Sequence, residues 1–153
     1  MMTHSCKVLQ ALQGRTLATA ESCTGGMIGE ALTAVPGSSA VYKGGIISYC
    51  NEAKAQLLNV PQSLLDRYGP VSEPVAVAMA EGARNAFSAD VAVSVTGIAG
   101  PGGDGSAHEV GTVFIGYSCA QGTFAKEFHF SGDRDAVRRQ AAQRALQLIL
   151  ENA

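Results

Sequence analysis

The order of apolar and polar residues divides the chain into extended and helical segments. Runs of β-favouring residues fall at five places: 16–20, 41–49, 91–95, 110–118 and 123–130. Apolar residues recur at helical spacing at six others: 3–13, 27–35, 51–58, a short piece within 60–68, 72–87, and a final segment after Asp133. The two kinds of segment are interleaved without repeats or linkers, which predicts a single α/β domain over residues 1–153.

The extended runs also indicate how the sheet is built. Residues 91–95 look buried on both faces and therefore predict a central strand. The runs at 110–118 and 123–130 alternate and are joined by a short turn, so we expect a hairpin that adds an antiparallel pair. Gly44 and Gly45 interrupt the run at 41–49 and predict a bulge or bend. The sheet is therefore predicted to be mixed.

Helix boundaries and buried faces follow from local residue types. Asn51 is predicted to be the N-cap of the helix that ends at Leu58, and Ser72 the cap of the next long helix, with Glu73 and Pro74 in its first turn. The predicted buried faces are Val75, Met79, Ala83 and Phe87 in that helix, and Val137, Ala141, Ala145 and Leu148 in the last.

Two glycine-rich loops each follow a predicted strand. The first, Ala20–Gly26 (AESCTGG), lies between a strand and a helix, where α/β sheets place ligands and where backbone N–H groups can bind an anion. The second is Thr96–Gly105 (TGIAGPGGDG). Neither matches a P-loop or a dinucleotide fingerprint. The pattern alone leaves an anion site and ordinary tight turns equally open.

Composition excludes several classes of protein. The 153 residues are 46% hydrophobic and 16% charged, as in globular proteins, and the net charge of −2 argues against a nucleic-acid footprint. The four cysteines form no C-x-x-C pair, so we expect no metal site and a reducing, cytoplasmic location. No secretory signal or bilayer-spanning apolar run is recognisable, so we expect no membrane partner.

Ser22 is the candidate nucleophile, and it needs a base. The three histidines are poorly placed for that role: one is near the N-terminus, one is in a loop, and one is in the hairpin. Lys54 is the alternative base, provided that burial keeps it neutral. Its spacing alone favours a solvated helix lysine. Cys23, at the start of a helix, is a rival nucleophile or else a small buried residue.

Arg134 and Arg138 lie four residues apart in the first turns of the last helix. Two cations there oppose the helix dipole, which makes sense if they bind an anion such as a phosphate. The alternative is surface pairing of Asp135 with Arg138 or Arg139.

Six ordered motifs carry a resemblance over nearly the whole chain: Ala20–Gly26 (AESCTGG), Pro36–Ser39 (PGSS), Ser48–Lys54 (SYCNEAK), Val71–Val75 (VSEPV), Thr96–Gly103 (TGIAGPGG) and Val110–Val113 (VGTV). Through these the chain resembles the CinA C-terminal domain family. The resemblance implies a three-layer α/β/α sandwich with a mixed, mostly parallel sheet. It also implies hydrolysis of the carboxamide of nicotinamide mononucleotide, a step in NAD recycling, without a cofactor.

The resemblance assigns roles to individual residues. It implies that Ser22 is the nucleophile and that Lys54 and Tyr49 complete the catalytic group. The implied substrate-binding residues are Thr24, Gly25, Gly26, Asn51, Thr96, Gly97, Arg134 and Arg138. Backbone N–H groups of the Gly25–Gly26 turn, or Thr96, are expected to stabilise the oxyanion, and the two arginines to hold the substrate phosphate.

Two other kinds of function remain open at this point. The same loops could serve a non-catalytic module that senses a pyridine nucleotide, and binding without ammonia release would identify it. A partner in DNA-linked competence complexes would instead show salt-sensitive DNA binding, for which the composition offers no basic surface. Family habit favours a homodimer.

Overall fold

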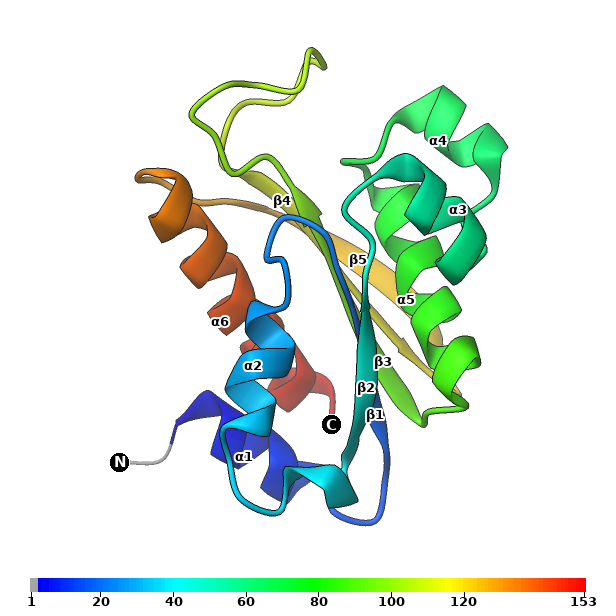
Figure 1. Ribbon diagram of the computed structural model, residues 1–153, viewed down its shortest axis with the longest axis vertical. Helices are drawn as coiled ribbons and strands as arrows, with labels where there is room; N and C mark the ends of the chain where they lie inside the picture. Colours follow the sequence, from blue (N-terminus) through cyan, green and yellow to red (C-terminus); the bar gives the residue numbers. More distant parts are fainter. Residues whose placement is uncertain (1–2) are drawn as a thin grey trace.

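The computed structural model describes residues 3–153, and a five-stranded sheet lies at its centre between two layers of helices (Figure 1). The strands are β1 (Leu17–Glu21), β2 (Tyr42–Ile47), β3 (Val91–Gly97), β4 (Thr112–Cys119) and β5 (Gly122–His129). The helices are α1 (His4–Ala11), α2 (Met27–Thr33), α3 (Asn51–Leu58), α4 (Gln62–Tyr68), α5 (Glu73–Phe87) and α6 (Arg134–Asn152), with a short 3-10 turn at Ser38–Ala40. This is the predicted three-layer α/β/α sandwich.

The sheet has the order β2-β1-β3-β4-β5 and is mixed, as predicted. β1 pairs in parallel with both β2 and β3, whereas β4 is antiparallel to β3 and to β5. Since β4 alone is reversed, the other four strands point the same way. The predicted hairpin is the β4–β5 pair, and the predicted central strand is β3, which is buried from Val91 to Thr96.

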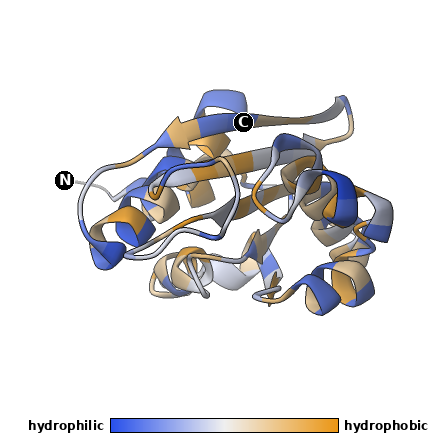
Figure 2. Cartoon of the chain, turned by 90° about the horizontal axis from the view of Figure 1, so that it is seen from above, coloured by the Kyte–Doolittle hydropathy of each residue, from blue (hydrophilic) through white to orange (hydrophobic). Residues whose placement is uncertain are grey.

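Two apolar cores flank the sheet. One lies under α1, α2 and α6 and includes Val8, Leu17, Leu32, Val93, Ile115, Leu146 and Ile149. The other lies under α3, α4 and α5 and includes Ala18, Leu58, Leu65, Val75, Met79 and Ala92. Figure 2 shows the same division, with hydrophobic colour on the central strands and hydrophilic colour on the outer sides of the helices. The predicted buried faces of α5 and α6 are confirmed, although Phe87 is only partly buried.

The predicted glycine bulge is present in β2. The register shifts between Leu17 and Ala18, whose partners are Tyr42 and Gly44, so Lys43 is the extra residue. Gly44 has φ +149°, and a Cβ there would lie 2.8 Å from the ring of Phe87. Glycine is therefore required at this position both by the backbone conformation and by the packing of α5 against β2.

Two capping predictions need correction. Asn51 is the first residue of α3 and not its cap: Cys50 occupies the N-cap position, without a side-chain hydrogen bond to the helix. Ser72 does occupy the N-cap of α5, but its hydroxyl donates to the carbonyl of Gly69, 2.9 Å away. Ser72 therefore fastens the turn before the helix, because its side chain is directed at the Gly69 carbonyl and its oxygen accepts no hydrogen bond from a helix amide.

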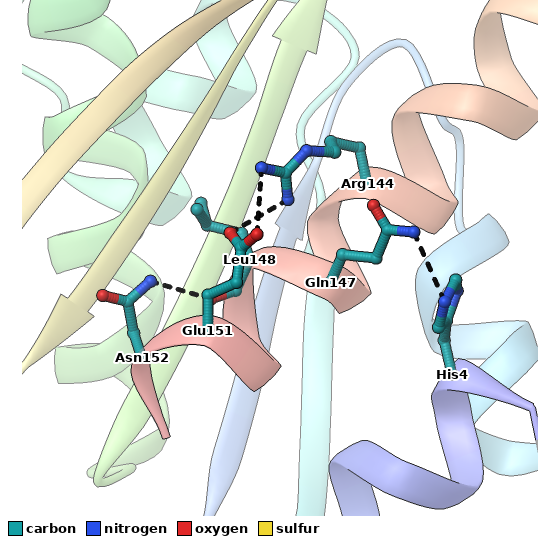
Figure 3. A network of polar contacts seen from close by, with 6 residues as sticks. All are labelled: His4, Arg144, Gln147, Leu148, Glu151 and Asn152. Carbon is teal, nitrogen blue, oxygen red and sulfur yellow. Dashed lines mark hydrogen bonds and ion pairs between the residues drawn. The ribbon is translucent and has the colours of Figure 1, made fainter.

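The first and last helices, α1 and α6, contact each other on one side of the sheet (Figure 3). Gln147 of α6 lies 3.3 Å from His4 of α1, and Arg144 pairs with Glu151 at 3.1 Å. The His4–Gln147 contact joins α1 to α6 outside the apolar core, whereas the Arg144–Glu151 pair lies within α6. His4 is thus engaged in a structural contact, which agrees with the prediction that it is no catalytic base.

Candidate active site

The loops after β1, β2 and β3 lie at the same end of the sheet, and a cavity of about 260 Å³ opens between them (Figure 1). Parallel strands bring their carboxyl ends to one edge, which is where α/β sheets bind ligands. The lining residues come from all three loops and from α3 and α6: Ser22, Cys23, Tyr49, Asn51, Lys54, Pro70, Val71, Thr96–Gly100, Gly102, Gly103, Asp104 and Arg134. None of the three histidines is among them.

Ser22 and Lys54 are in direct contact inside this cavity. The Lys54 Nζ donates to the Ser22 Oγ at 3.1 Å and to the carbonyl oxygen of Ser48 at 2.8 Å. Ser22 is 8% exposed, and Lys54 is 1% exposed. The solvated surface lysine that the spacing favoured is therefore not what the fold produces, because the N-terminal turn of α3 packs under the end of β1.

Burial changes the protonation of Lys54. It removes water from the ammonium and so lowers the pKa of Lys54 below its ordinary value, while the Cys50 and Cys23 thiols oppose the shift. No carboxylate within residues 3–153 forms an ion pair with Lys54. Both conditions favour the neutral amine, which is the form that can accept a proton.

Cys23 is adjacent to Ser22 but has the opposite electrostatic character. Burial raises the pKa of the Cys23 thiol to about 11, even though Arg138 and Lys54 partly offset the shift. At neutral pH the sulfur is therefore a thiol, which is a poor nucleophile. The geometry favours Ser22 over Cys23, and Cys23 matches the alternative of a small buried residue.

Glu21 fills the anion position that the first loop would otherwise offer. This carboxylate is 2% exposed and accepts hydrogen bonds from the Thr24 hydroxyl at 2.6 Å and from the amides of Gly26, Ile28 and Gly29 at 3.0–3.2 Å. A carboxylate at a helix N-terminus satisfies the free amides and the dipole there. The first turn of α2 is therefore closed to a substrate phosphate.

Only some of the predicted site residues of the first loop reach the cavity. Ser22 lines the cavity, but Thr24, Gly25 and Gly26 do not. The Gly25 amide donates to the Ser22 carbonyl at 3.1 Å and the Gly26 amide to Glu21. These two amides therefore have intramolecular acceptors, which argues against the expected oxyanion role for the Gly25–Gly26 turn.

Thr96, Gly97 and Asn51 do line the cavity. The Thr96 hydroxyl donates to the carbonyl of Pro70 at 2.8 Å, so it connects β3 to the segment before α5. A Cβ at Gly97 would lie 2.6 Å from Val113, so the absence of a side chain lets the second loop leave the sheet close to β4. Gly97 thus shapes the cavity wall through its backbone.

Arg134 and Arg138 contact different loops. Arg134 lines the cavity and donates to the Gly100 carbonyl at 2.7 Å and to the Tyr49 hydroxyl at 3.0 Å. Arg138 lies outside the cavity lining and donates to the carbonyls of Cys23 at 2.9 Å and Thr24 at 3.3 Å. The predicted surface pairing is confirmed for Arg139, which pairs with Asp135 at 2.9 Å, and it does not involve Arg138.

Tyr49 lies at the cavity mouth. It is 63% exposed, and its hydroxyl bonds to Arg134. Among the described residues, it makes no hydrogen bond to Ser22 or Lys54, so the structure does not bring the three predicted catalytic residues into one hydrogen-bonded group.

Glu21 and Asp104 are the site residues that sequence reasoning missed. Glu21 is part of the first motif, but it precedes Gly26, the N-cap of α2, and Glu21 and Thr24 stand in the reverse order of a capping box, so no standard capping pattern would have found it. Asp104 lies in the cavity wall on the second loop. No cluster of three or more metal-ligating side chains occurs within residues 3–153, and no helix there is both long and apolar enough to cross a membrane.

The family of this chain follows from comparison with known sequences. The sequence model of the CinA C-terminal domain matches residues 2–153, so the chain belongs to the CinA C-terminal domain family. Its curated relatives include the nicotinamide-nucleotide amidohydrolase PncC of Escherichia coli (strain K12), which is 49% identical over 152 residues covering 97% of this chain and 92% of the relative. The predicted family is confirmed.

Longer proteins and solved structures match as well. A CinA-like protein from Anaeromyxobacter sp. (strain K) is 52% identical over 139 residues, 91% of this chain but 34% of that protein. The crystal structure of competence/damage inducible protein CihA from Agrobacterium tumefaciens has a TM-score of 0.93 at 36% identity, covering 97% of this chain and 92% of its own. Competence damage-inducible protein A from Klebsiella pneumoniae subsp. pneumoniae MGH 78578 gives 0.95 at 34%, covering 97% and 94%.

Proposed function

We propose that this protein is a nicotinamide-nucleotide amidohydrolase that converts nicotinamide mononucleotide to nicotinate mononucleotide and ammonia. The contact that carries the proposal is the buried pair of Ser22 and Lys54, 3.1 Å apart in a cavity at the sheet edge. The relative from Escherichia coli, similar over nearly its whole length, is named for this activity. A nucleophile beside a base of lowered pKa is the arrangement that acyl transfer needs.

The proposed first step uses Lys54 as the base. A neutral amine has two hydrogens and one lone pair, so Lys54 can donate to the Ser48 carbonyl while its lone pair accepts the Ser22 proton. The Ser22 Oγ then attacks the carboxamide carbon and forms a tetrahedral oxyanion. The Lys54 ammonium returns its proton to the leaving nitrogen, and ammonia departs. Water, activated by the same amine, hydrolyses the ester on Ser22.

The proton transfer between Ser22 and Lys54 is proposed to be direct. The two atoms are within hydrogen-bond distance, whereas the Tyr49 hydroxyl is bonded to Arg134 at the cavity mouth. A route through Tyr49 would require this hydroxyl to leave its partner. Tyr49 is better suited to contacting the bound nucleotide than to relaying the proton.

Arg134 is the proposed ligand of the substrate phosphate. It is the cavity-lining arginine of the pair, and its five N–H donors exceed the two carbonyl and hydroxyl acceptors it has here. An arginine of this kind can bind a phosphate with two parallel hydrogen bonds. Arg138 is directed at the loop backbone and is not proposed to touch the phosphate.

The experiment that tests this function measures ammonia release from four compounds: nicotinamide, its riboside, its mononucleotide, and NAD. We expect release from the mononucleotide, and at least tenfold lower kcat/KM for the riboside because it lacks the phosphate. Binding of the mononucleotide without ammonia release would instead support a pyridine-nucleotide sensor. A homodimer and a cytoplasmic location remain predictions.

A further inference from the structure

The Cys23 amide is a polar group of the nucleophile loop that has no protein oxygen as acceptor within the described residues, and its partner there is its own thiol sulfur. Within residues 3–153 the amides of Ser22, Gly25, Gly26 and Met27 donate to protein oxygens, whereas no such bond leaves the amides of Cys23 and Thr24, and of these two residues Cys23 lines the cavity. Cys23 lies in the cavity wall directly after the nucleophile. An N–H beside the attacking atom that has no oxygen acceptor within the protein is the type of donor that stabilises an oxyanion.

Arg138 is connected to this amide through two peptide groups. Its guanidinium donates to the Thr24 carbonyl at 3.3 Å, and the Gly25 amide of that same peptide group donates to the Ser22 carbonyl at 3.1 Å. The Ser22 carbonyl belongs in turn to the peptide group whose N–H is the Cys23 amide. A trans peptide holds its C=O and N–H antiparallel, so fixing one end fixes the direction of the other.

The chain of hydrogen bonds also transmits polarisation. A cation that binds a carbonyl oxygen strengthens the N–H of the same peptide group as a donor, and successive peptide groups reinforce one another. Arg138 holds a second point of the loop as well, the Cys23 carbonyl at 2.9 Å. Its guanidinium also packs against Gly25, where a Cβ would lie 3.2 Å from it.

Building on the proposed function, we propose that the Cys23 amide is the oxyanion donor and that Arg138 is a positioning residue that orients and polarises it through the Thr24–Gly25 and Ser22–Cys23 peptide groups. Arg134, one helical turn earlier, has the separate task of binding the substrate. The two arginines therefore affect different kinetic constants.

The test compares the Arg138→Ala and Arg138→Lys variants with Arg139→Ala, a neighbouring exposed arginine that pairs with Asp135. Ammonia release from nicotinamide mononucleotide gives kcat and KM. We expect Arg138→Ala to lower kcat about 100-fold, the size of a lost oxyanion donor, with KM within about threefold of wild type. Arg138→Lys should be intermediate, because the ammonium keeps the positive charge but lacks the planar fork of donors with which the guanidinium binds the two loop carbonyls. Arg139→Ala should equal wild type.

A second probe separates positioning from a general structural effect. The aldehyde analogue of the mononucleotide has CHO in place of the carboxamide; Ser22 adds to its carbonyl carbon, the carbonyl electrons move to the oxygen, and the Ser22 proton passes to Lys54. Its affinity should fall by the same factor as kcat in Arg138→Ala. The affinity of Ser22→Ala for the mononucleotide should be equal with and without the Arg138→Ala change. In wild type, the ¹H signal of the Cys23 amide should move downfield when the adduct forms.

Three results would overturn the inference. A raised KM with unchanged kcat would make Arg138 a substrate ligand. Equal losses of affinity for the aldehyde and for the mononucleotide would indicate a structural effect. An unmoved Cys23 amide signal in the adduct would exclude it as the donor. If Arg138→Ala does not fold, the same comparisons are made on Arg138→Lys. Failure of the proposed function is distinguishable, since wild type would then release no ammonia.

Discussion

The two glycine-rich loops of the cavity look alike in sequence and differ in how they are held. The first, Ser22–Gly26, is held by Glu21 at the Thr24 hydroxyl and the Gly26 amide, and by Arg138 at the carbonyls of Cys23 and Thr24. The second is held by Arg134 at Gly100, while residues 101–107 are exposed and the Asp104 side chain bonds only within the loop, to Ser106. The first glycine-rich loop is therefore fixed by side chains that bond to its backbone, whereas most of the second loop is exposed to solvent and less constrained. We infer that the first loop performs the chemistry and the second contributes to substrate contact.

The largest expected effect follows from removing the base beside the first loop. Lys54→Met should lower the rate of ammonia release by about 10³-fold or more, because the nucleophile then has no proton acceptor. Circular dichroism checks that the variant is folded. The matched control is Lys43→Met, an exposed lysine of β2, which should retain full activity. A comparable loss of ammonia release in Lys54→Met and Lys43→Met would contradict a role for Lys54 as the base.

The pH dependence of the rate should show the lowered pKa of Lys54. Burial disfavours its ammonium, so the active neutral form increases as pH rises, and kcat/KM should rise about tenfold per pH unit until an apparent pKa below the ordinary value of about 10.4. The measurement is the initial rate of ammonia release between pH 6 and 10. A rate that falls with rising pH over this range contradicts Lys54 as a base.

Glu21→Gln is predicted to loosen the first loop. One carboxylate oxygen becomes an NH₂ group that cannot accept from the amides of α2, so we expect a loss of about 2–3 kcal/mol in the free energy of unfolding. Urea denaturation measures it. Glu30→Gln, an exposed change on the same helix, should stay within about 0.5 kcal/mol of wild type. An equally small effect at Glu21 would mean that the loop does not depend on this carboxylate.

Arg134→Ala is predicted to act on binding. Loss of the phosphate contact should raise KM about tenfold, with a smaller change in kcat, since the residue lies at the cavity mouth and away from the Ser22–Lys54 pair. Steady-state kinetics with the mononucleotide and the riboside measure this effect. The variant should leave the riboside rate nearly unchanged; a similar loss for both compounds would contradict a phosphate contact.

The smallest expected effect tests the open loop itself. Gly103→Ala adds a methyl group where no atom lies within 4 Å and where φ is not positive, so stability should change by less than about 0.5 kcal/mol. Gly26→Ala, at φ +110° and 3.2 Å from Ile47, should cost about 1–2 kcal/mol. Thermal unfolding of both variants gives the comparison. Equal costs would show that the loops are not held differently.

Sequence patterns predicted the layers of this fold well, because buried faces repeat with the period of each element. The central β3 and the apolar face of α6 are examples. Cap residues were predicted less well: the side chain of Ser72 is directed at the Gly69 carbonyl and not at the helix amides, an orientation that local propensity does not contain. The contact between Ser22 and Lys54 joins residues 32 positions apart, and spacing alone favoured a solvated lysine at position 54. Only the family resemblance brought these two residues together before the structure did.

The arginines show the limit of that resemblance. Both were expected to hold the phosphate, yet the direction of each guanidinium depends on the crossing of α6 over the loops, which no motif encodes. Arg138 meets the carbonyls of the first loop, and Arg134 meets the cavity. The motif identified both arginines as site residues. Their different proposed roles follow from how α6 packs against the loops.

The central claim is that Ser22 is the nucleophile of a carboxamide hydrolase. It is tested most directly by the rate of ammonia release from nicotinamide mononucleotide with wild-type protein, Ser22→Ala and Cys23→Ala, each at equal concentration and checked for folding. The account predicts release by wild type and by Cys23→Ala, and none above background by Ser22→Ala. Near-normal release by Ser22→Ala, together with an inactive Cys23→Ala, would contradict it.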